Sequence, residues 1–561
     1  MNNYTPPSTP QRSRGLITTF FVISFLILSC SSFYLFWFKE FGQLDRHAEF
    51  IFSAIKELIF YHSSVTIEQY WIALSEGQIR AKLLSYATLV IVLSAFLSFI
   101  AIRLLFFRHA GRTQDIKVKG GKLRLRTPDK TIQKGASHLF IHPELPLDSH
   151  QYTGNLFTFG AHGSGKSTLI KFLVSQLIGQ RGKSVILFDE KREYTQIFYK
   201  PDSVHLIAPW DARTCIWDIG SDLKSIPQFR QFVSQLIPID ESKPTWGQGA
   251  QDIMIALMLC CQKESSLSWK ALSHWLSMPV DDWLDSFEKY YPPALKFITG
   301  ADETVSSYIS NLSSNIAWIH DLALLENSSN KKISFNEWIK GDRSKFNTVI
   351  IQSHPFHTEM MAKLASAILH CVSLEVLSSE DNESEELWLI LDELGNLPKL
   401  ESLQKWLSTG RSKGARTIAG TQNISQTKEV YGENISETLL SLFKNHVVFQ
   451  CGAIGKTPEL ASDSLGQVVF ERPSKSSSSN GDSTFTWHKF TENLVPKVDI
   501  INLKNTKFGV VGFAKVSGDS DVYKLEWGYN QYAQIAPSTV ISDGSEHEQT
   551  KSNRLKVKRT G

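Results

Sequence analysis

The fold class follows from one short stretch, Gly160-Ala161-His162-Gly163-Ser164-Gly165-Lys166-Ser167. It matches the phosphate-binding pattern GxxxxGK[ST]. A short apolar run at 155–159 predicts a strand directly before it, and residues 167–178 have the spacing of a helix. In such a loop the glycines let backbone N–H groups turn inward around phosphate, at the positive end of the helix. The sequence therefore predicts a P-loop within an α/β core.

The loop also predicts its ligand, ATP with Mg²⁺. Lys166 would place a cation on the β- and γ-phosphates, and Ser167 would offer a hydroxyl to Mg²⁺. The residues expected to hold the nucleotide are Gly160, Gly163, Ser164, Gly165, Lys166, Ser167 and Thr168. His162 is interpreted as a variable loop residue.

A second apolar run, 387–391, ends in the two carboxylates Asp392 and Glu393. Paired with a P-loop, Asp392 is expected to hold the Mg²⁺ shell and Glu393 to polarise the attacking water as general base. Gln422 ends the next predicted strand, 30 residues after Asp392, and is expected to reach the γ-phosphate or its water. Arg411 lies 19 residues after Asp392 in a Gly-flanked loop, and its spacing alone fits a solvated surface arginine equally well.

Short apolar runs alternate with helical stretches after residue 154, which predicts a parallel sheet covered on both faces. The expected strands are 155–159, 184–188, 348–351, 387–391, 416–419 and 447–450. Residues 227–326 lack strand-like runs and predict an all-helical insertion. We expect a flexible loop at 474–482 and a disordered basic tail at 536–561.

Two uncharged stretches near the N-terminus, 16–38 and 83–102, are long enough to cross a membrane as helices. Both are apolar on every face, so lipid suits them better than a protein core. A cleaved signal peptide and a lipoprotein site at Cys30 are the alternatives, but the first run continues past Cys30 to Phe38.

Charge predicts the orientation of these spans. Between them, 39–82 carries both signs, whereas basic residues flank the outer ends. These residues are Arg12, Arg14, Arg103, Arg108, Arg112, Lys117, Lys119, Lys122, Arg124 and Arg126. The positive-inside rule places both termini in the cytoplasm. The net charge of the whole chain, +3, argues neither for nor against nucleic acid.

The expected organisation is a cytoplasmic N-terminus at 1–15, a transmembrane helix at 16–38, a periplasmic loop at 39–82 and a second transmembrane helix at 83–107. The P-loop ATPase domain follows in two parts, 108–226 and 327–535, interrupted by the helical insertion at 227–326. The tail, 536–561, ends the chain.

Taken together, these features resemble the conjugative coupling proteins of the TraD/TrwB type. The resemblance rests on the two spans, on the P-loop and on three motifs that follow in family order: LDELGNLPKL, GRSKGAR and AGTQNISQ. Pro209-Trp210-Asp211-Ala212-Arg213 and Trp217-Asp218 resemble a family segment, and Thr245-Trp246 looks like the start of the family's all-alpha domain, with Trp246 in place of the usual Phe.

The resemblance implies a RecA-like P-loop ATPase in the bacterial inner membrane, assembled as a homo-hexamer with ATP at subunit interfaces. It implies Arg411 as an arginine finger acting on a neighbouring subunit. The implied cargo is single-stranded DNA with its relaxase, recruited from the relaxosome and pumped to a type IV secretion channel during conjugation.

Three alternatives remain open from the residues alone. One is a double-stranded DNA translocase of the FtsK type, and another is a secretion ATPase that moves only protein. The third is a membrane receptor that uses ATP as a structural ligand, although a pure binder has no need of the base Glu393.

The charge pattern makes a prediction about topology. A phosphatase reporter fused near Ser64 should be active, because that segment is expected outside the cytoplasm, and one fused near Gly120 should be inactive. Enzyme activity in whole cells is the measurement. An active fusion at Gly120 would contradict the charge argument.

Overall fold

The computed structural model describes residues 14–41, 44–76, 80–102, 115–125, 139–240, 244–326, 331–341, 343–477 and 483–541. The chain divides into two compact units. The first combines Met1–Lys119 with Val469–Thr491, and the second combines Gly120–Val468 with Glu492–Gly561.

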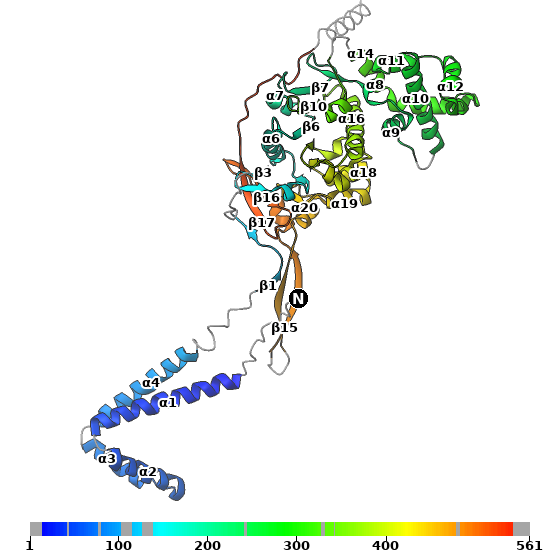
Figure 1. Cartoon of the computed structure of the whole chain (residues 1–561). Coiled ribbons are helices and arrows are strands. Elements are labelled where there is room, and N and C mark those ends of the chain that lie inside the picture. Colours follow the sequence, from blue (N-terminus) through cyan, green and yellow to red (C-terminus); the bar gives the residue numbers. More distant parts are fainter. Residues whose placement is uncertain are drawn as a thin grey trace, which may run out of the picture. The chain divides into compact units, whose positions relative to one another are not determined.

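Two apolar helices of the first unit, α1 (Arg14–Phe41) and α4 (Arg80–Ile102), pack against each other (Figure 1). Phe36 stacks on Tyr86 with ring centroids 4.0 Å apart, and the Tyr86 hydroxyl donates to the Ser32 carbonyl at 3.2 Å. Most other large side chains of both helices stay exposed. Length and composition make them candidate membrane spans, in agreement with the sequence prediction.

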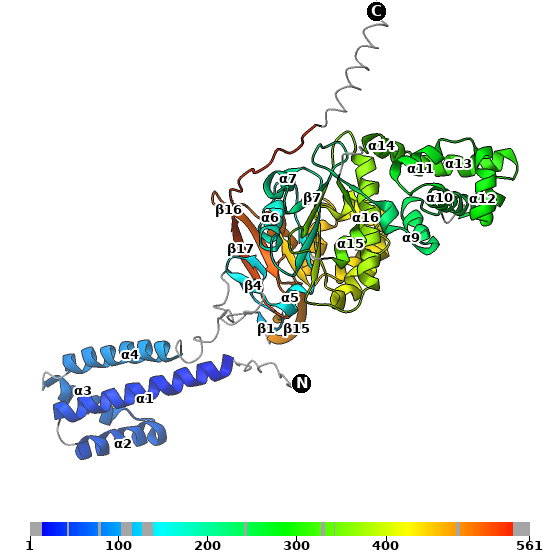
Figure 2. The same cartoon turned by 45° about the horizontal axis from the view of Figure 1, so that its top comes forward.

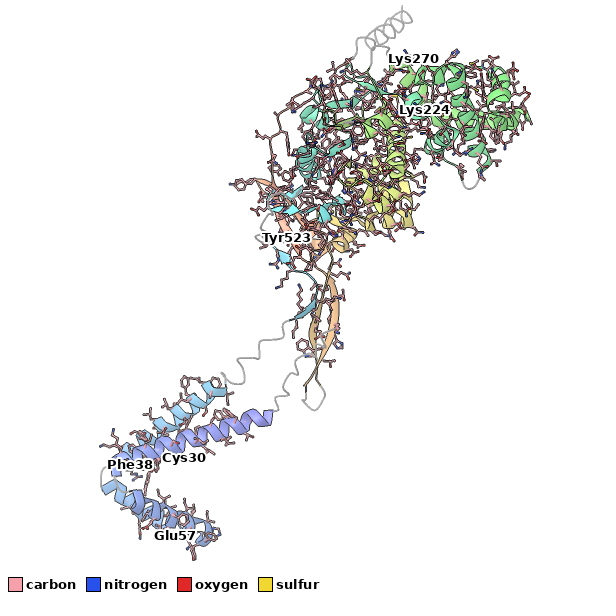
Figure 3. All side chains as sticks on the ribbon, viewed as in Figure 1. Cys30, Phe38, Glu57, Lys224, Lys270 and Tyr523 are labelled. Atoms are coloured by element: carbon pink, nitrogen blue, oxygen red, sulfur yellow. The ribbon has the colours of Figure 1, made fainter. Side chains whose placement is uncertain are left out.

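The segment between the spans is mostly helical, with α2 (Leu44–Tyr61) followed by α3 (Val65–Glu76). Glu57, labelled in Figure 3, joins the two by accepting hydrogen bonds from the hydroxyls of Thr66 and Ser63. These bonds, that from Thr66 first, hold the pKa of Glu57 below its usual value. Of the basic flanks, Arg12, Arg103, Arg108, Arg112 and Arg126 lie outside the described residues.

A three-stranded sheet of order β1-β14-β15 corrects one expectation. Its strands are β1 (Ile116–Lys119), β14 (Gln467–Ser477) and β15 (Ser483–Asn493). Residues 474–477 were expected in a flexible loop and instead end β14. Strands pair through backbone hydrogen bonds, which a serine-rich segment can also form. The neighbouring strand β15 is rich in Thr and aromatic residues, which favour strands, so it can pair with the serine-rich end of β14. Residues 478–482 lie outside the described residues.

A ten-stranded sheet of order β2-β17-β16-β13-β5-β12-β11-β6-β10-β7 forms the centre of the second unit. The strands are β2 (Leu123–Arg124), β5 (Leu156–Phe159), β6 (Lys183–Asp189), β7 (Val204–Ile207), β10 (Thr348–Gln352), β11 (Glu386–Leu391), β12 (Ala415–Thr421), β13 (Asn445–Val448), β16 (Gly509–Lys515) and β17 (Val522–Gly528). From β13 to β7 all neighbours are parallel. The six predicted strands are confirmed, whereas β7 and the antiparallel pair β16–β17 were not predicted.

Helices cover both faces of this sheet, with α6 and α7 on one side and α15 and α16 on the other (Figure 2). The helices of the core are α5 (Ser149–Tyr152), α6 (Lys166–Leu177), α7 (Glu193–Phe198), α15 (Phe335–Lys340), α16 (Thr358–Ser378), α17 (Leu403–Thr409), α18 (Ile424–Tyr431), α19 (Glu433–Ser441), α20 (Thr457–Ser464) and α21 (Lys497–Ile501). A small hairpin, β3 (Leu139–His142) with β4 (Leu145–Leu147), packs beside α6. Helix α16 is also long and apolar enough to span a membrane, but 67% of it is buried, so it is a core helix.

The predicted helical insertion is present and begins at α9. Its helices are α9 (Ile226–Leu236), α10 (Pro244–Glu264), α11 (Trp269–Leu276), α12 (Leu284–Tyr290), α13 (Asp302–Ile316) and α14 (Trp318–Leu325). Trp246 was expected to open this domain but lies in its second helix, because Pro227 and the capping residue Ser225 already start α9. The fully buried rings of Trp269, Trp283 and Phe287 lie in its core.

The segment after β17 corrects the expected start of the tail. Residues 536–541 were expected to be disordered, yet Val540 N–H donates to Asp211 Oδ2 at 2.8 Å and the Arg213 guanidinium donates to the Pro537 carbonyl at 3.0 Å. A β-bridge joins Asp211 to Ile541. Hydrogen bonds between its backbone and the side chains of Asp211 and Arg213 therefore order this stretch. Residues 542–561 lie outside the described residues.

The buried carboxylate of Asp222 links the two segments through which the chain enters and leaves the helical insertion. The chain enters through β8 (Cys215–Trp217) and α8 (Ile219–Asp222), and returns through β9 (Lys331–Ile333), which pairs with β8. Asp222 accepts hydrogen bonds from Trp217 Nε1 at 2.7 Å, Phe335 N at 2.8 Å and Asn336 N at 3.1 Å, and from the Ser334 hydroxyl. Burial raises the pKa of Asp222, and these donors oppose that rise.

Replacing Asp222 by alanine should therefore destabilise the junction. Each buried donor left without a partner costs about 1–3 kcal/mol. Asp218→Ala, which removes a more exposed cap of α8, is the matched control and should cost only about 1 kcal/mol. Thermal unfolding and limited proteolysis near residue 330 are the measurements. Equal melting temperatures for Asp222→Ala and the unmodified protein would contradict this role.

Candidate functional site

The P-loop lines a cavity of about 280 Å³ at the carboxyl edge of the parallel strands. This is the edge where open α/β sheets bind ligands, because the loops after the strands meet there. The lining residues are Ala161, His162, Gly163, Gly165, Lys166, Ser167, Thr168, Phe188, Glu190, Lys191, Glu193, Tyr194, Asp392, Glu393, Gln422, Val510 and Tyr529. Segments that are far apart in the sequence therefore converge on the predicted phosphate loop.

The P-loop glycines are required by space and by backbone conformation. Gly165 has φ +126°, and a Cβ there would lie 2.7 Å from two carbons of the Val510 side chain. Gly160 has no room either, since its Cβ would lie 2.3 Å from Ser164 Oγ. Gly160 and Ser164 thus shape the loop from behind, while the other predicted nucleotide residues line the cavity.

Lys166 and Glu393 form a buried pair in the cavity, with Nζ 3.4 Å from Oε2. Lys166 Nζ also donates to the Gly160 carbonyl at 2.9 Å. Burial lowers the pKa of Lys166 and raises that of Glu393, and each charge opposes the shift of the other. Glu393 further accepts hydrogen bonds from Thr421 Oγ1 at 2.9 Å and from Gln422 N–H at 2.9 Å. The carboxylate is therefore fixed at the cavity wall.

Asp392 lies beside the start of α6, where Ser167 Oγ is 3.3 Å from its Oδ2. The Tyr194 hydroxyl donates to the same Oδ2 at 3.0 Å. Its Oδ1 is buried and has no hydrogen-bond partner among the described residues. A buried carboxylate oxygen without a donor, next to a serine hydroxyl, is the hard oxygen environment that Mg²⁺ prefers. The residues present therefore fit this cation.

Gln422 and Arg411 lie at opposite ends of β12. Gln422 follows the carboxyl end and lines the cavity, as expected. Arg411 precedes the amino end, in the 3-10 turn η5 (Gly410–Lys413), and is not among the lining residues of its own cavity. Gly414 N–H donates to the Arg411 carbonyl at 3.1 Å and closes this turn. The guanidinium is half exposed, with Nε 3.8 Å from Glu383 Oε1.

Several lining residues were missed by the sequence analysis. Val510 comes from β16 and Tyr529 follows β17, and these strands were not predicted. Tyr194 stands in the charged stretch after β6, and it carries no motif that would single it out. Their place at the cavity follows only from the order of the strands.

The comparisons agree with this geometry. Residues 139–526 match the model of the family described as type IV secretion-system coupling protein DNA-binding domain. Coupling protein TraD of Escherichia coli (strain K12) is 22% identical over 493 residues, which cover 86% of this chain and 68% of the relative.

Solved structures share the fold. The conjugative coupling protein TrwBdeltaN70 in its unbound monoclinic form aligns with a TM-score of 0.65 and 23% identity, over 76% of this chain and 96% of its own. The plasmid coupling protein TrwB in complex with ADP and Mg²⁺ aligns with a TM-score of 0.64 and 22% identity, over 76% and 98%. A RecA-like P-loop core with a helical insertion is thus the fold of this chain. Because the family model matches more than half of the sequence, this chain belongs to the type IV secretion-system coupling proteins.

Proposed function

We propose that this protein is a membrane-anchored ATPase that recruits a relaxase bound to single-stranded DNA and drives the DNA to a type IV secretion channel. The observation that carries the proposal is the group formed by Lys166, Asp392 and Glu393 at one cavity, in a chain of the coupling-protein family. A cation for phosphate, a free carboxylate oxygen for Mg²⁺ and a buried base are the parts that ATP hydrolysis needs.

The nucleotide would be ATP, with Ser167 and Asp392 offering oxygens to Mg²⁺, which would neutralise phosphate charge there. Lys166 is paired with Glu393 at the cavity. An arriving phosphate group competes for Lys166, since it carries more negative charge than one carboxylate. Glu393 would then lose its cation and become a better proton acceptor. Binding would thereby prepare the base, while Thr421 and Gln422 keep it in place.

Related structures support this choice of ligand. TrwB has been solved with ADP and Mg²⁺ and with the non-hydrolysable analogue ADPNP. Those complexes concern TrwB itself. This chain shares that fold and brings its own P-loop, Ser167 and Asp392 together at one cavity, so we extend the binding of ATP and Mg²⁺ to it.

For the membrane, we propose that α1 and α4 span the inner membrane with both termini and the ATPase domain in the cytoplasm. The helices α2 and α3 would then form the periplasmic segment. The domain boundaries expected from the sequence stand as proposed, with two exceptions: Val469–Thr491 belong to the first unit, and the second part of the ATPase domain extends to residue 541.

For the assembly, we propose a homo-hexamer in which Arg411 acts on the ATP of a neighbour. Arg411 lies at the amino end of β12, and the cavity lies at the carboxyl end of the same strand. Its guanidinium cannot serve its own cavity without unfolding η5. A half-exposed arginine on the outer edge of a subunit is instead placed for contact with a second copy.

A double-stranded DNA translocase and a protein-only secretion ATPase share the core chemistry. They differ in what should stimulate turnover. ATPase activity of the full chain in detergent, measured with single-stranded DNA, with duplex DNA and without DNA, separates the three. Stimulation by duplex DNA alone would favour the first alternative, and no DNA response the second.

Turnover should depend on Glu393 and binding on Lys166. Glu393→Gln should keep ATP binding and lose hydrolysis by about 10²–10⁴-fold, because water loses its base. Lys166→Ala should weaken binding, because the phosphate cation is gone. The control is Glu437→Gln, an exposed glutamate of α19. Phosphate release and equilibrium binding are the measurements, and normal turnover in Glu393→Gln would place the base elsewhere.

Arg411→Ala should bind ATP normally and hydrolyse it poorly, since an arginine finger contributes about 10³–10⁵-fold. Mixing it with Lys166→Ala should restore part of the activity, because a mixed interface can pair an intact P-loop with an intact finger. Lys413→Ala, in the same turn, is the control and should stay active. Mixed, co-assembled rings as inactive as either parent would exclude action on the neighbour.

A further inference from the structure

The tyrosine at position 194 is buried against the carboxylate that is expected to face Mg²⁺. We propose that Tyr194 is a positioning residue for this cation, whose hydroxyl holds the Asp392 carboxylate beside Ser167, the second residue expected at the metal. The inference rests on the proposed binding of ATP with Mg²⁺. It assigns a role to a side chain that belongs to neither the P-loop nor the acidic pair at the end of β11.

The two oxygens of Asp392 have different surroundings. Oδ2 accepts from the Tyr194 hydroxyl at 3.0 Å and lies 3.3 Å from Ser167 Oγ. Oδ1 is buried and, within the described part of the chain, accepts no hydrogen bond. A carboxylate on a short side chain can rotate, and rotation would exchange its two oxygens. The bond from Tyr194 opposes this rotation and keeps Oδ2 beside the Ser167 hydroxyl.

The phenol of Tyr194 suits this role because it donates a hydrogen bond without carrying a charge. A lysine or arginine in its place would compete with Mg²⁺ for the same carboxylate. A phenol has an unperturbed pKa of about 10, so the hydroxyl keeps its proton at neutral pH. Its ring stacks on Phe198, with centroids 6.5 Å apart, which limits movement of the hydroxyl.

The helix that carries Tyr194 is itself anchored. Asp189, at the end of β6, accepts from the backbone N–H of Thr195 at 2.7 Å and from its hydroxyl at 2.8 Å. Gln352 Nε2 donates to the same hydroxyl at 2.9 Å and to the Ser538 carbonyl at 2.8 Å. Three buried side chains from β6, α7 and β10 thus fix the start of α7. The distance between Tyr194 and Asp392 is set by the sheet and does not depend on a flexible loop.

Tyr194→Phe tests the role, because it removes the hydroxyl and keeps the ring. The full chain in detergent micelles is titrated with a fluorescent ADP analogue, first in EDTA and then over a series of Mg²⁺ concentrations. The affinity in EDTA should be unchanged. The Mg²⁺ concentration for half-maximal tightening should rise about 10–100-fold, the usual effect of losing a group that orients a metal ligand. Binding reports folded protein only, so unfolded chains do not affect the midpoint.

Tyr431→Phe is the matched control. Tyr431 is equally buried, and its hydroxyl accepts a hydrogen bond from Leu400 N–H at 3.3 Å. It is not among the cavity residues, so its loss should leave the Mg²⁺ midpoint unchanged. If Tyr194→Phe does not fold, Thr195→Val takes its place. It removes the hydroxyl that anchors α7 and should shift the midpoint in the same direction.

The outcomes separate this inference from the proposed function. A wild-type protein that binds no ADP analogue, with or without Mg²⁺, overturns both. A wild-type response to Mg²⁺ that Tyr194→Phe reproduces overturns only the role of Tyr194. An equal loss of affinity in EDTA and in Mg²⁺ also overturns it, because the tyrosine would then support the cavity as a whole.

Discussion

The contact between Lys166 and Glu393 is the interaction on which the core depends. Two buried charges are costly unless they are paired and hydrogen-bonded, and here each has partners from different segments. The pair can form only if β5 and β11 end at the same edge of the sheet. That arrangement in turn places Asp392 beside the start of α6 and the backbone of Gln422 over Glu393. One electrostatic requirement thereby gathers the residues of the candidate site.

The opposite edge of the sheet explains why one chain is not a complete enzyme under the proposed mechanism. β12 separates Gln422 from Arg411, with one residue at each end. A strand of seven residues is about 23 Å long, so residues that flank its two ends cannot meet at one site. A role for Arg411 in phosphoryl transfer consequently requires a second copy, and this links the chemistry of the proposed site to ring assembly.

The first unit follows a different physical rule. Its paired helices bury few large side chains, with Phe36 and Leu83 at their small contact, and leave most apolar residues outward. α16 has a similar composition but packs against a sheet. Composition therefore allows both kinds of helix to span a membrane. Whether a helix is buried in the protein depends on the elements that pack against it. A helix beside a sheet buries its apolar side chains in the protein core, whereas α1 and α4 can pack only against each other and leave most apolar side chains for lipid.

The sequence by itself determined the P-loop, the six central strands and the helical insertion. It also predicted Lys166, Ser167, Asp392 and Glu393 as members of one site, and the structure brings them to one cavity. These follow from local patterns: glycines at fixed spacing, and apolar runs that end in carboxylates. Only the tertiary structure decided the order of the strands, the contribution of Val510 and Tyr529 to the cavity, and the bond from Tyr194 to Asp392. It also ordered 474–477 and 536–541, which composition predicts as loop and tail. The reason is that backbone hydrogen bonds and burial depend on what lies beside a segment in space, and a linear pattern does not contain that information.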